Sequence, residues 1–390
     1  MSRSIYIHYP FCKRKCSYCD FYSITSLQMA DVYLDALIKE IHSNMSKAER
    51  FSPLSVFIGG GTPSLLPPAS LERILLALSE HCDVGNAIEF TMECNPGASE
   101  SQFFADYRSL GVNRLSIGIQ SFVPSELRFL NRIHTAGEAQ AAVQTAAKAG
   151  FENLSLDLIF AVPGQTPESW RYSLSRAIEL PVSHISAYSL IYEEGTPLYK
   201  RYIRGALKII EEDEDTEMFF DAGKILGSAG LSRYEISNFA KPGFECLHNL
   251  HYWRRGEYYA FGPSAHSYLN GERKKNVADL REYVRLINRD GNAVIETEAL
   301  TAEQITIEKI YLGLRAEGMK LDDFSAEGYD APKIKNLPFV VDLQKEGLAK
   351  LNGNLLTLTE RGRFLADGIA ERLISILGGD YGDPNGNPSA

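Results

Sequence analysis

Three cysteines near the start of the chain, Cys12, Cys16 and Cys19, constrain its chemistry more than any other feature of the sequence. Their spacing is Cys-x3-Cys-x2-Cys, and no fourth cysteine follows nearby. Three thiolates can hold three irons of a [4Fe–4S] cluster and leave the fourth iron open, whereas a cluster with four protein ligands normally only carries electrons. The motif therefore predicts a cluster that takes part in catalysis or ligand binding.

A zinc site is the alternative interpretation of the same motif. Zinc usually takes four protein ligands, and His8 lies four residues upstream of Cys12. Against zinc, the motif directly follows the first expected strand, at the end of a barrel strand where active sites gather. Lys13 and Lys15 would favour thiolates, and the neighbouring aromatic side chains would shield a cluster. We therefore expect the cluster.

Composition bounds the class of protein. The 390 residues carry a formal net charge of −10, which argues against general nucleic-acid binding. The sequence has no apolar signal segment and no apolar run of membrane-spanning length, so we expect a cytoplasmic protein. Six cysteines in such a chain point away from a disulfide framework, and we expect Cys82 and Cys94 to be small buried hydrophobes.

Short β-rich apolar runs alternate with amphipathic helical stretches through the first half of the chain. The expected strands are Ile5–His8, Ser55–Ile58, Ala87–Met92, Arg114–Ile117, Asn153–Leu158 and His184–Ser189. The expected helices between them are Asp31–Glu49, Ser70–His81, Gln102–Leu110, Ala136–Ala149 and Ser169–Glu179. Such repetition favours a parallel sheet with right-handed crossovers, and six units are too few for a closed eight-stranded barrel. We predict an α/β fold, an open partial (β/α)6 TIM-like barrel.

The whole chain is expected to divide into four segments. We expect the barrel domain over 1–233, a loop-rich connection over 234–290, a small C-terminal α+β domain over 291–377, and a disordered tail over 378–390. Thr301 opens a capping-box pattern before an apolar helix, and Asn352-Gly353 between two apolar runs predicts a hairpin. Helices with one hairpin suggest a winged-helix-like arrangement.

Polar and glycine residues follow the expected strands. The run from Gly59 to Pro63 follows the second strand, where glycines let the backbone approach a ligand or form a tight turn. With these motifs the chain resembles the radical S-adenosylmethionine (SAM) superfamily over nearly its whole length. There the open iron chelates SAM, and one electron from the cluster gives a 5′-deoxyadenosyl radical. The resemblance implies that Cys12, Cys16 and Cys19 hold the cluster. It also implies that SAM is bound by Tyr6, Tyr18, Gly60, Gly61, Thr62, Glu93, Gln120, Arg132 and Asp157.

Four stretches narrow the resemblance to the oxygen-independent coproporphyrinogen III oxidase family. They are Tyr6-x-His-x-Pro-Phe-Cys12, the glycine run, Asp157–Thr166 and Tyr188–Leu198. Decarboxylating members of that family continue the motif to a further cysteine and carry an N-terminal extension. Here Phe21 stands where that cysteine would fall, and 11 residues precede Cys12. Oxidative decarboxylation of coproporphyrinogen III to protoporphyrinogen IX is therefore our second hypothesis.

The stretch His248-Asn-Leu-His-Tyr252-Trp253 contains the motif His-Asn-x-x-Tyr-Trp. It is similar to the signature of HemW-type haem chaperones, relatives in the same family that bind haem and deliver it to acceptor proteins. His248 can ligate haem iron, and Tyr252 and Trp253 offer flat apolar faces to a porphyrin. The plainer explanation is a loop histidine with ordinary hydrogen bonds. Cys246 and His251 are further candidate ligands, and His266 matches a family-like stretch without an assigned role.

The resemblance thus implies a haem chaperone with three cofactors, a [4Fe–4S] cluster, SAM and haem. The implied partners are haem, acceptor haem proteins, which include respiratory proteins at the membrane, and an electron donor for the cluster, but no nucleic acid. We expect a cytoplasmic location with transient contact to membrane-bound acceptors. The sequence leaves open whether SAM is cleaved and whether the protein is an enzyme.

Overall fold

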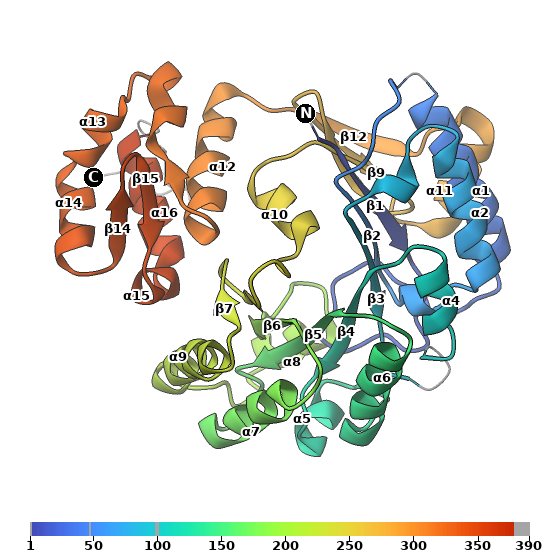
Figure 1. Cartoon of the computed structure of the whole chain (residues 1–390), viewed down its shortest axis with the longest axis horizontal. Coiled ribbons are helices and arrows are strands. Elements are labelled where there is room, and N and C mark those ends of the chain that lie inside the picture. Colours follow the sequence, from blue (N-terminus) through green and yellow to red (C-terminus); the bar gives the residue numbers. More distant parts are fainter. Residues whose placement is uncertain (1, 47, 98–100, 378–390) are drawn as a thin grey trace. The chain divides into compact units, whose positions relative to one another are not determined.

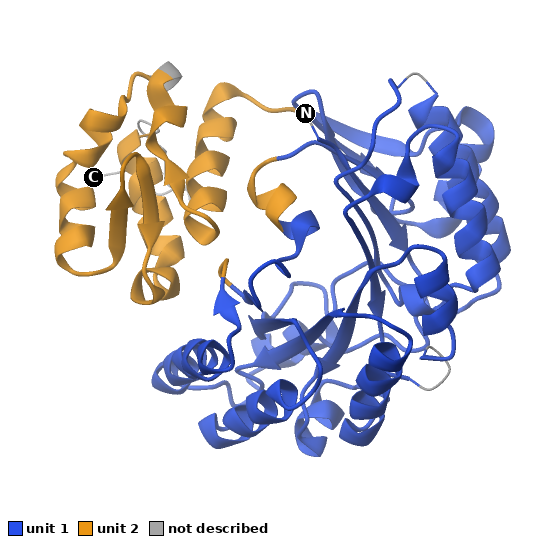
Figure 2. Cartoon of the chain, viewed as in Figure 1, with its two compact units in different colours: residues 1–233, 237–249, 256–298 blue, residues 234–236, 250–255, 299–390 orange. Residues whose placement is uncertain are grey.

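The computed structural model describes residues 2–46, 48–97 and 101–377. The chain forms two compact units (Figure 2). Unit 1 takes residues up to 233, with 237–249 and 256–298; unit 2 takes 234–236, 250–255 and the chain from 299 on. The tail 378–390, expected to be disordered, lies outside the described residues. The division of the chain into four functional segments stays a prediction.

Unit 1 is built on a sheet whose centre is six parallel strands, in sequence order (Figure 1). They are β1 (Ser4–Tyr9), β2 (Ser55–Gly60), β3 (Glu89–Cys94), β4 (Arg114–Gln120), β5 (Asn153–Phe160) and β6 (His184–Ser189). The full order is β12-β11-β10-β9-β1-β2-β3-β4-β5-β6-β8-β7, and within the described residues its two end strands do not pair with each other. The predicted open, partial barrel is confirmed.

Helices connect the strands and cover the outer face of the sheet (Figure 1). They are α1 (Ala30–Met45), α2 (Pro68–Ser79), α4 (Phe104–Ser109), α5 (Pro124–Phe129), α6 (Ala136–Lys148), α7 (Pro167–Ile178), α8 (Pro197–Ile203), α9 (Glu212–Ser228) and α11 (Leu280–Asp290). Thr135 and Thr166 cap α6 and α7 through reciprocal side-chain bonds with the third helical residue.

The segment expected to be a loop-rich connection contains regular elements. These are β8 (Asn238–Ala240), α10 (Leu247–Trp253), β9 (Tyr258–Phe261), β10 (His266–Leu269) and β11 (Glu272–Asn276). Strand β7 (Ser232–Arg233) lies just before this segment, and β12 (Val294–Ala299) lies just after it. Strand β9 lies parallel to β1, with Tyr259 opposite Ile5. The expectation of a loop was wrong for β9, because a strand of four residues is too short to show a periodic pattern of apolar side chains. Its partner, β1, lies at the other end of the sequence of unit 1.

Alternation along the parallel strands separates apolar from polar side chains. Ile5 and Ile7 of β1, with Val56 and Ile58 of β2, are fully buried in the core, which lies under the helices. Since side chains alternate with a period of two, the residues between them face the barrel interior. That inner set comprises Ser4, Tyr6, His8, Ser55, Phe57, Glu89, Thr91, Glu93, Arg114, Ser116, Ser155, Asp157, His184 and Ser186. The interior is therefore polar enough to hold a polar ligand.

A buried carboxylate joins α1 to the segment after β9. Glu40 accepts hydrogen bonds from the Gly262 amide at 2.8 Å, from Asn276 Nδ2 at 2.6 Å and from the Tyr283 hydroxyl at 2.5 Å. Gly262 has φ of +102°, and a Cβ there would lie 2.5 Å from the His8 carbonyl oxygen. Desolvation, which outweighs these three donors, raises the pKa of Glu40 to about 7.

Glu40→Gln should change how the stability of the protein depends on pH. The native state holds a proton on Glu40 that the unfolded chain releases above its ordinary pKa of 4.5. The free energy of unfolding of the wild type should therefore fall, relative to the variant, as pH rises from about 4.5 to about 7, and level off above. The slope of this difference approaches about 1.4 kcal/mol per pH unit. Urea unfolding of both proteins at a series of pH values measures it, and parallel curves would contradict it.

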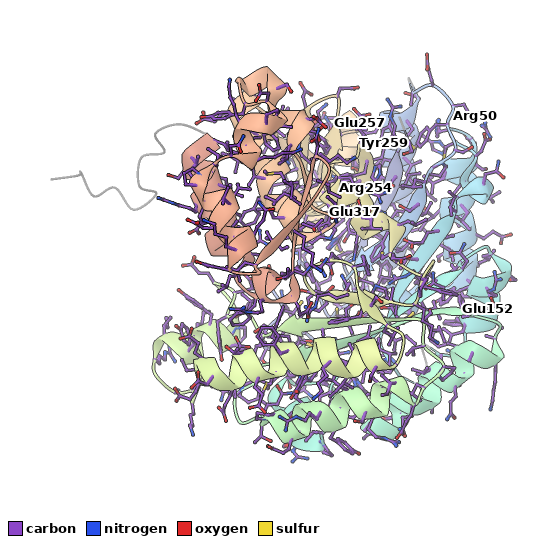
Figure 3. All side chains as sticks on the ribbon, turned by 60° about the vertical axis from the view of Figure 1, so that its left-hand side comes forward. Arg50, Glu152, Arg254, Glu257, Tyr259 and Glu317 are labelled. Atoms are coloured by element: carbon purple, nitrogen blue, oxygen red, sulfur yellow. The ribbon has the colours of Figure 1, made fainter. Side chains whose placement is uncertain are left out.

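Unit 2 takes the described chain from residue 299 on, together with residues 234–236 and 250–255. Its elements are α12 (Ala302–Arg315), β13 (Met319–Lys320), a 3₁₀ turn (Leu321–Glu327), α13 (Ala331–Lys335), α14 (Pro338–Lys345), β14 (Ala349–Asn352), β15 (Leu355–Leu358), α15 (Glu360–Phe364) and α16 (Ala366–Leu377). The antiparallel sheet β13-β15-β14 includes the expected hairpin, and the helices bury one apolar core against it. Within this unit Arg254 and Glu317, labelled in Figure 3, form two hydrogen bonds of 2.6 Å.

Of the helices that the structure describes, none has the length and apolar character needed to cross a membrane.

Candidate functional site

The cysteine motif lies directly after β1, at the carboxyl end of the parallel strands. Cys12, Cys16 and Cys19 are half-buried, and none forms a disulfide. The backbone of Cys12 is held by an N–H bond to the Ile24 carbonyl at 2.9 Å, and Ile24 donates in turn to the Pro10 carbonyl. The loop is thereby closed at its base, so the three thiols stand on a fixed segment.

Hydrogen bonds link two of the cysteines through side chains that follow β2, β3 and α5. The Thr62 hydroxyl donates to Cys12 Sγ at 3.4 Å and accepts from Asn95 Nδ2 at 2.8 Å. Asn95 Oδ1 accepts from Arg132 Nη2 at 2.5 Å, and Arg132 Nη1 lies 3.4 Å from Cys16 Sγ. The chain of contacts runs continuously from Cys12 to Cys16. Asn95 is its centre, and we did not single it out from the sequence, although it lies two residues after Glu93 in the same strand-end motif.

The glycine run after β2 is required by the backbone of the cysteine segment. A Cβ on Gly61 would lie 2.6 Å from the Phe11 carbonyl oxygen, and one on Gly60 would lie 2.6 Å from the His8 ring. Gly60 also has φ of +105°, which favours glycine. The amides of Gly61 and Thr62 donate to the Tyr9 and Phe11 carbonyls. Close approach of two protein segments is therefore a sufficient reason for these glycines.

Two half-buried carboxyl groups, those of Glu93 in β3 and Asp157 in β5, face the interior. Glu93 Oε2 accepts from the Gly60 amide at 3.1 Å, and both oxygens of Asp157 accept from the Ser116 hydroxyl at 3.1 and 3.2 Å. Desolvation, followed by the charge of Asp157, raises the pKa of Glu93 to about 7. Desolvation also raises the pKa of Asp157. Each carboxyl group is thus easily protonated and can hold a hydrogen-bonding ligand.

The other predicted SAM-binding residues surround this polar interior. Tyr6 contacts His8 Nδ1 through its hydroxyl at 3.2 Å, and burial raises the pKa values of Tyr6 and Tyr18. Gln120 has a left-handed φ of +69°, at a register shift between β4 and β5. Burial also raises the pKa of Cys19 to about 11, because desolvation outweighs the backbone hydrogen bond at Phe21 that lowers it.

The first turn of α10 lies at the opposite, amino-terminal end of the strands. Glu89, the first residue of β3, accepts from the amides of Leu247 at 2.9 Å and His248 at 3.1 Å. His248 Nδ1 lies 2.8 Å from the hydroxyl oxygen of Ser55, the first residue of β2. Its ring stacks on Phe57 with centroids 4.9 Å apart, and only 1% of His248 is exposed. The structure thus places His248 inside the barrel, at the end away from the cysteines.

The other residues of the predicted haem motif differ in their surroundings. Cys246 is buried in unit 1, and desolvation raises the pKa of its thiol to about 12, which disfavours a thiolate ligand. His251 is buried, whereas Tyr252 and Trp253 are half-buried; all three belong to unit 2. Phe21, at the position of the family's additional cysteine, is 60% exposed.

Sequence comparisons place the chain among known proteins. The sequence profile of the radical SAM superfamily matches residues 6–177. The heme chaperone HemW of Bacillus subtilis is 35% identical over 371 residues, which cover 94% of this chain and 98% of that protein. The heme chaperone HemW of Mycobacterium tuberculosis is 34% identical and covers 95% of this chain and 94% of its own length. The Escherichia coli protein of the same name is 38% identical over 267 residues, 67% of this chain and 69% of its own.

A solved structure shares the fold. Coproporphyrinogen III oxidase (HemN) from Escherichia coli, described as a radical SAM enzyme, superposes with a TM-score of 0.79. The match covers 96% of this chain and 90% of that one, at 24% sequence identity. At this identity the similarity concerns the fold alone, and the relatives that exceed 30% identity over nearly their whole length decide the family. The chain belongs to the HemW family of radical SAM proteins.

Proposed function

We propose that this protein is a haem chaperone that binds haem and transfers it to acceptor haem proteins, with a [4Fe–4S] cluster and SAM bound at the carboxyl end of its barrel. The observation that carries the proposal is the 35% identity to a heme chaperone over 94% of the chain. The His-Asn-x-x-Tyr-Trp motif on α10 supports it. Decarboxylation of coproporphyrinogen III is not favoured, because the more similar relatives carry the chaperone name and Phe21 replaces the additional cysteine.

The residues around the cysteine motif fit a cluster. The three thiols form no disulfide and lie on a loop held by backbone hydrogen bonds. Thr62 contacts Cys12 Sγ, and Arg132 contacts Cys16 Sγ. Hydrogen bonds to thiolate sulfur offset the negative charge of a cluster and tune its reduction potential. When bound, the cluster supplies one-electron chemistry, and an external electron donor is needed for it. Cys12, Cys16 and Cys19 would each hold one of the four irons of the cluster.

The polar interior next to the motif fits SAM, which carries amino, carboxylate and ribose hydroxyl groups. Glu93 offers carboxylate oxygens to hydroxyl or amino donors, and Arg132 carries the positive charge for a carboxylate. Asp157 provides a second, half-buried acceptor. Gly60, Gly61, Thr62, Gln120, Tyr6 and Tyr18 complete the proposed surroundings.

Haem binding by His248 requires a local rearrangement. Nδ1 of His248 lies within hydrogen-bond distance of Ser55, and the ring is stacked on Phe57. A porphyrin cannot reach a ring that is 1% exposed, so the first turn of α10 has to leave the barrel before His248 meets haem iron. Glu89 accepts hydrogen bonds from two backbone amides of that turn, and these bonds have to break before haem can enter. Haem is the cargo in this proposal, and release to an acceptor reverses the same change.

Haem titration of anaerobically reconstituted protein tests the proposal, followed by mixing with an apo-form haem protein. We expect a Soret band that saturates at one haem per chain and then shifts to the spectrum of the acceptor. In parallel, incubation with coproporphyrinogen III, SAM and dithionite should yield no protoporphyrinogen IX. Formation of that product without stoichiometric haem binding would replace the chaperone proposal with the enzyme.

Thr62→Val should lower the reduction potential of the reconstituted cluster. The substitution keeps the shape of the side chain but removes the hydroxyl that donates to Cys12 Sγ. A net hydrogen-bond energy of about 0.5–1.5 kcal/mol corresponds to roughly 20–60 mV for one electron. The shift is toward more negative values, because the reduced cluster carries more negative charge and gains more from the donor. A redox titration followed by electron paramagnetic resonance measures it.

Thr91→Val is the matched control. Thr91 is a fully buried residue of β3, and its hydroxyl has no hydrogen-bond partner within the described part of the chain. The same loss of a hydroxyl there should leave the reduction potential unchanged. Equal potentials in the wild type and in Thr62→Val would show that the hydroxyl does not act on the cluster.

A further inference from the structure

Two histidines and a glutamate meet at the carboxyl-terminal ends of α1 and α2 in unit 1. His42 lies in the last turn of α1, and Glu80 and His81 follow α2 directly. His42 Nδ1 lies 3.0 Å from His81 Nε2 and 3.6 Å from Glu80 Oε2. One ligand atom from each residue lies within 4.8 Å of the others. Among the described residues, no other group of three or more His, Cys, Asp or Glu side chains has its ligand atoms this close together.

The spacing of these atoms is close to that of a coordinated divalent metal ion. Zinc–nitrogen bonds are 2.0–2.1 Å long, so two imidazole nitrogens at tetrahedral angles stand roughly 3.3 Å apart. The separation of 3.0 Å between His42 and His81 needs an opening of a few tenths of an ångström. Both rings are half-buried and Glu80 is exposed, so this adjustment meets little resistance and water can take a fourth position.

Neighbouring contacts hold the ligand-bearing segment in place. Arg50, labelled in Figure 3, donates to the carbonyl oxygens of Ser79 at 3.2 Å and Glu80 at 3.5 Å. Its positive charge is paired with Asp83 at 2.6 Å, which limits its repulsion of a cation. The His81 amide donates to the Leu78 carbonyl at 2.9 Å. Desolvation, followed by the proximity of His42, lowers the pKa of His81.

We propose that His42, Glu80 and His81 form a binding site for a divalent transition metal ion, tested here with Zn²⁺. This site is separate from those proposed for the cluster, SAM and haem. Two imidazoles and one carboxylate are ligands that suit zinc and neighbouring first-row ions. The ligands come from the ends of α1 and α2, two helices packed side by side, so a bound ion joins these helices and stabilises the folded state. The alternative for the same geometry is a hydrogen bond between the two histidines, in which one ring nitrogen donates and the other accepts.

Zinc binding to the cluster-loaded, full-length protein tests this site, because cluster loading keeps Cys12, Cys16 and Cys19 occupied. We expect calorimetry to show one Zn²⁺ per chain with a rise in Tm. X-ray absorption at the zinc edge should show nitrogen and oxygen neighbours at about 2.0–2.1 Å with imidazole scattering. His42→Gln and His81→Gln should each weaken binding at least tenfold, and the double variant should lose both the binding and the Tm shift.

His266→Gln is the control, since His266 is an exposed histidine on β10, outside the cluster of ligands. It should bind Zn²⁺ as the wild type does. Unchanged zinc affinity in the double variant would overturn the proposal. So would a zinc–sulfur shell at about 2.3 Å in the wild type, which identifies cysteine ligands without the use of any variant. Circular dichroism and iron content confirm that each variant is folded before its affinity is compared.

Discussion

Cys16→Ser should reduce the iron content of reconstituted protein from about four atoms per chain to about one or fewer, and abolish the broad absorbance of the cluster near 400 nm. A cluster with an open iron has three thiolate ligands, so the loss of one leaves two, too few to retain it. The variant also removes the sulfur that lies 3.4 Å from Arg132 Nη1. Iron and sulfide analysis after anaerobic reconstitution and desalting measures the effect.

Cys82→Ser is the control for this experiment. Cys82 is fully buried, and its thiol donates to the Leu78 carbonyl, as expected for a small core residue outside the motif. The same chemical change there should leave iron and sulfide at the wild-type level, even if Tm falls. Wild-type iron content in Cys16→Ser would contradict the assignment of the three cysteines. A wild-type protein that holds one zinc and no sulfide would favour the zinc alternative.

His248→Ala should weaken haem binding at least tenfold, which corresponds to about 1.4 kcal/mol, and shift the Soret band of the residual complex. The reason is the loss of the imidazole proposed to ligate haem iron. Added imidazole should restore the wild-type spectrum by filling the vacated position. Equilibrium titration with haem, with and without imidazole, gives both quantities. An unchanged spectrum in the variant would exclude His248 as the ligand and direct attention to His251.

Ser55→Ala separates ligation from packing in the same experiment. His248 is buried against Phe57, so its removal also loosens the barrel interior. Ser55→Ala removes the hydroxyl within hydrogen-bond distance of His248 Nδ1 but keeps the imidazole. If His248 must leave the barrel to meet haem, Ser55→Ala should bind haem faster or more tightly, whereas His248→Ala binds it more weakly. If His248 is only structural, both variants should lower haem binding in step with their stability.

The central fold of unit 1 could be predicted from the chain because its signals are local. Runs such as Ser55–Ile58 and His184–Ser189 are short and β-rich, and the capping residues Thr135 and Thr166 mark where helices begin. Each of these signals depends on neighbours within a few residues. The errors in strand bounds are at most three residues: the expected Arg114–Ile117 is observed as Arg114–Gln120, and Ala87–Met92 as Glu89–Cys94.

Strand β9 and helix α10 could not be predicted in the same way. Tyr258–Phe261 is too short for a periodic signal, and it becomes a strand by pairing with β1. The first turn of α10 is ordered by Glu89, which is distant in sequence. Its burial therefore follows from tertiary contacts, and the location of His248 inside the barrel was not foreseen. The meeting of His42 with His81 likewise depends on the packing of α1 against α2.

By itself, the sequence determined the three-cysteine motif, the alternation that places polar residues on one face of each strand, and the family to which the chain belongs. The tertiary structure alone decided which of these polar residues meet. It links Cys12 to Cys16 through Thr62, Asn95 and Arg132, and it separates His248 from the cysteines by the length of the barrel strands. The physical reason is the range of the interactions: strand and helix preferences act between neighbours in the chain, whereas hydrogen bonds between strand ends exist only after the sheet has formed.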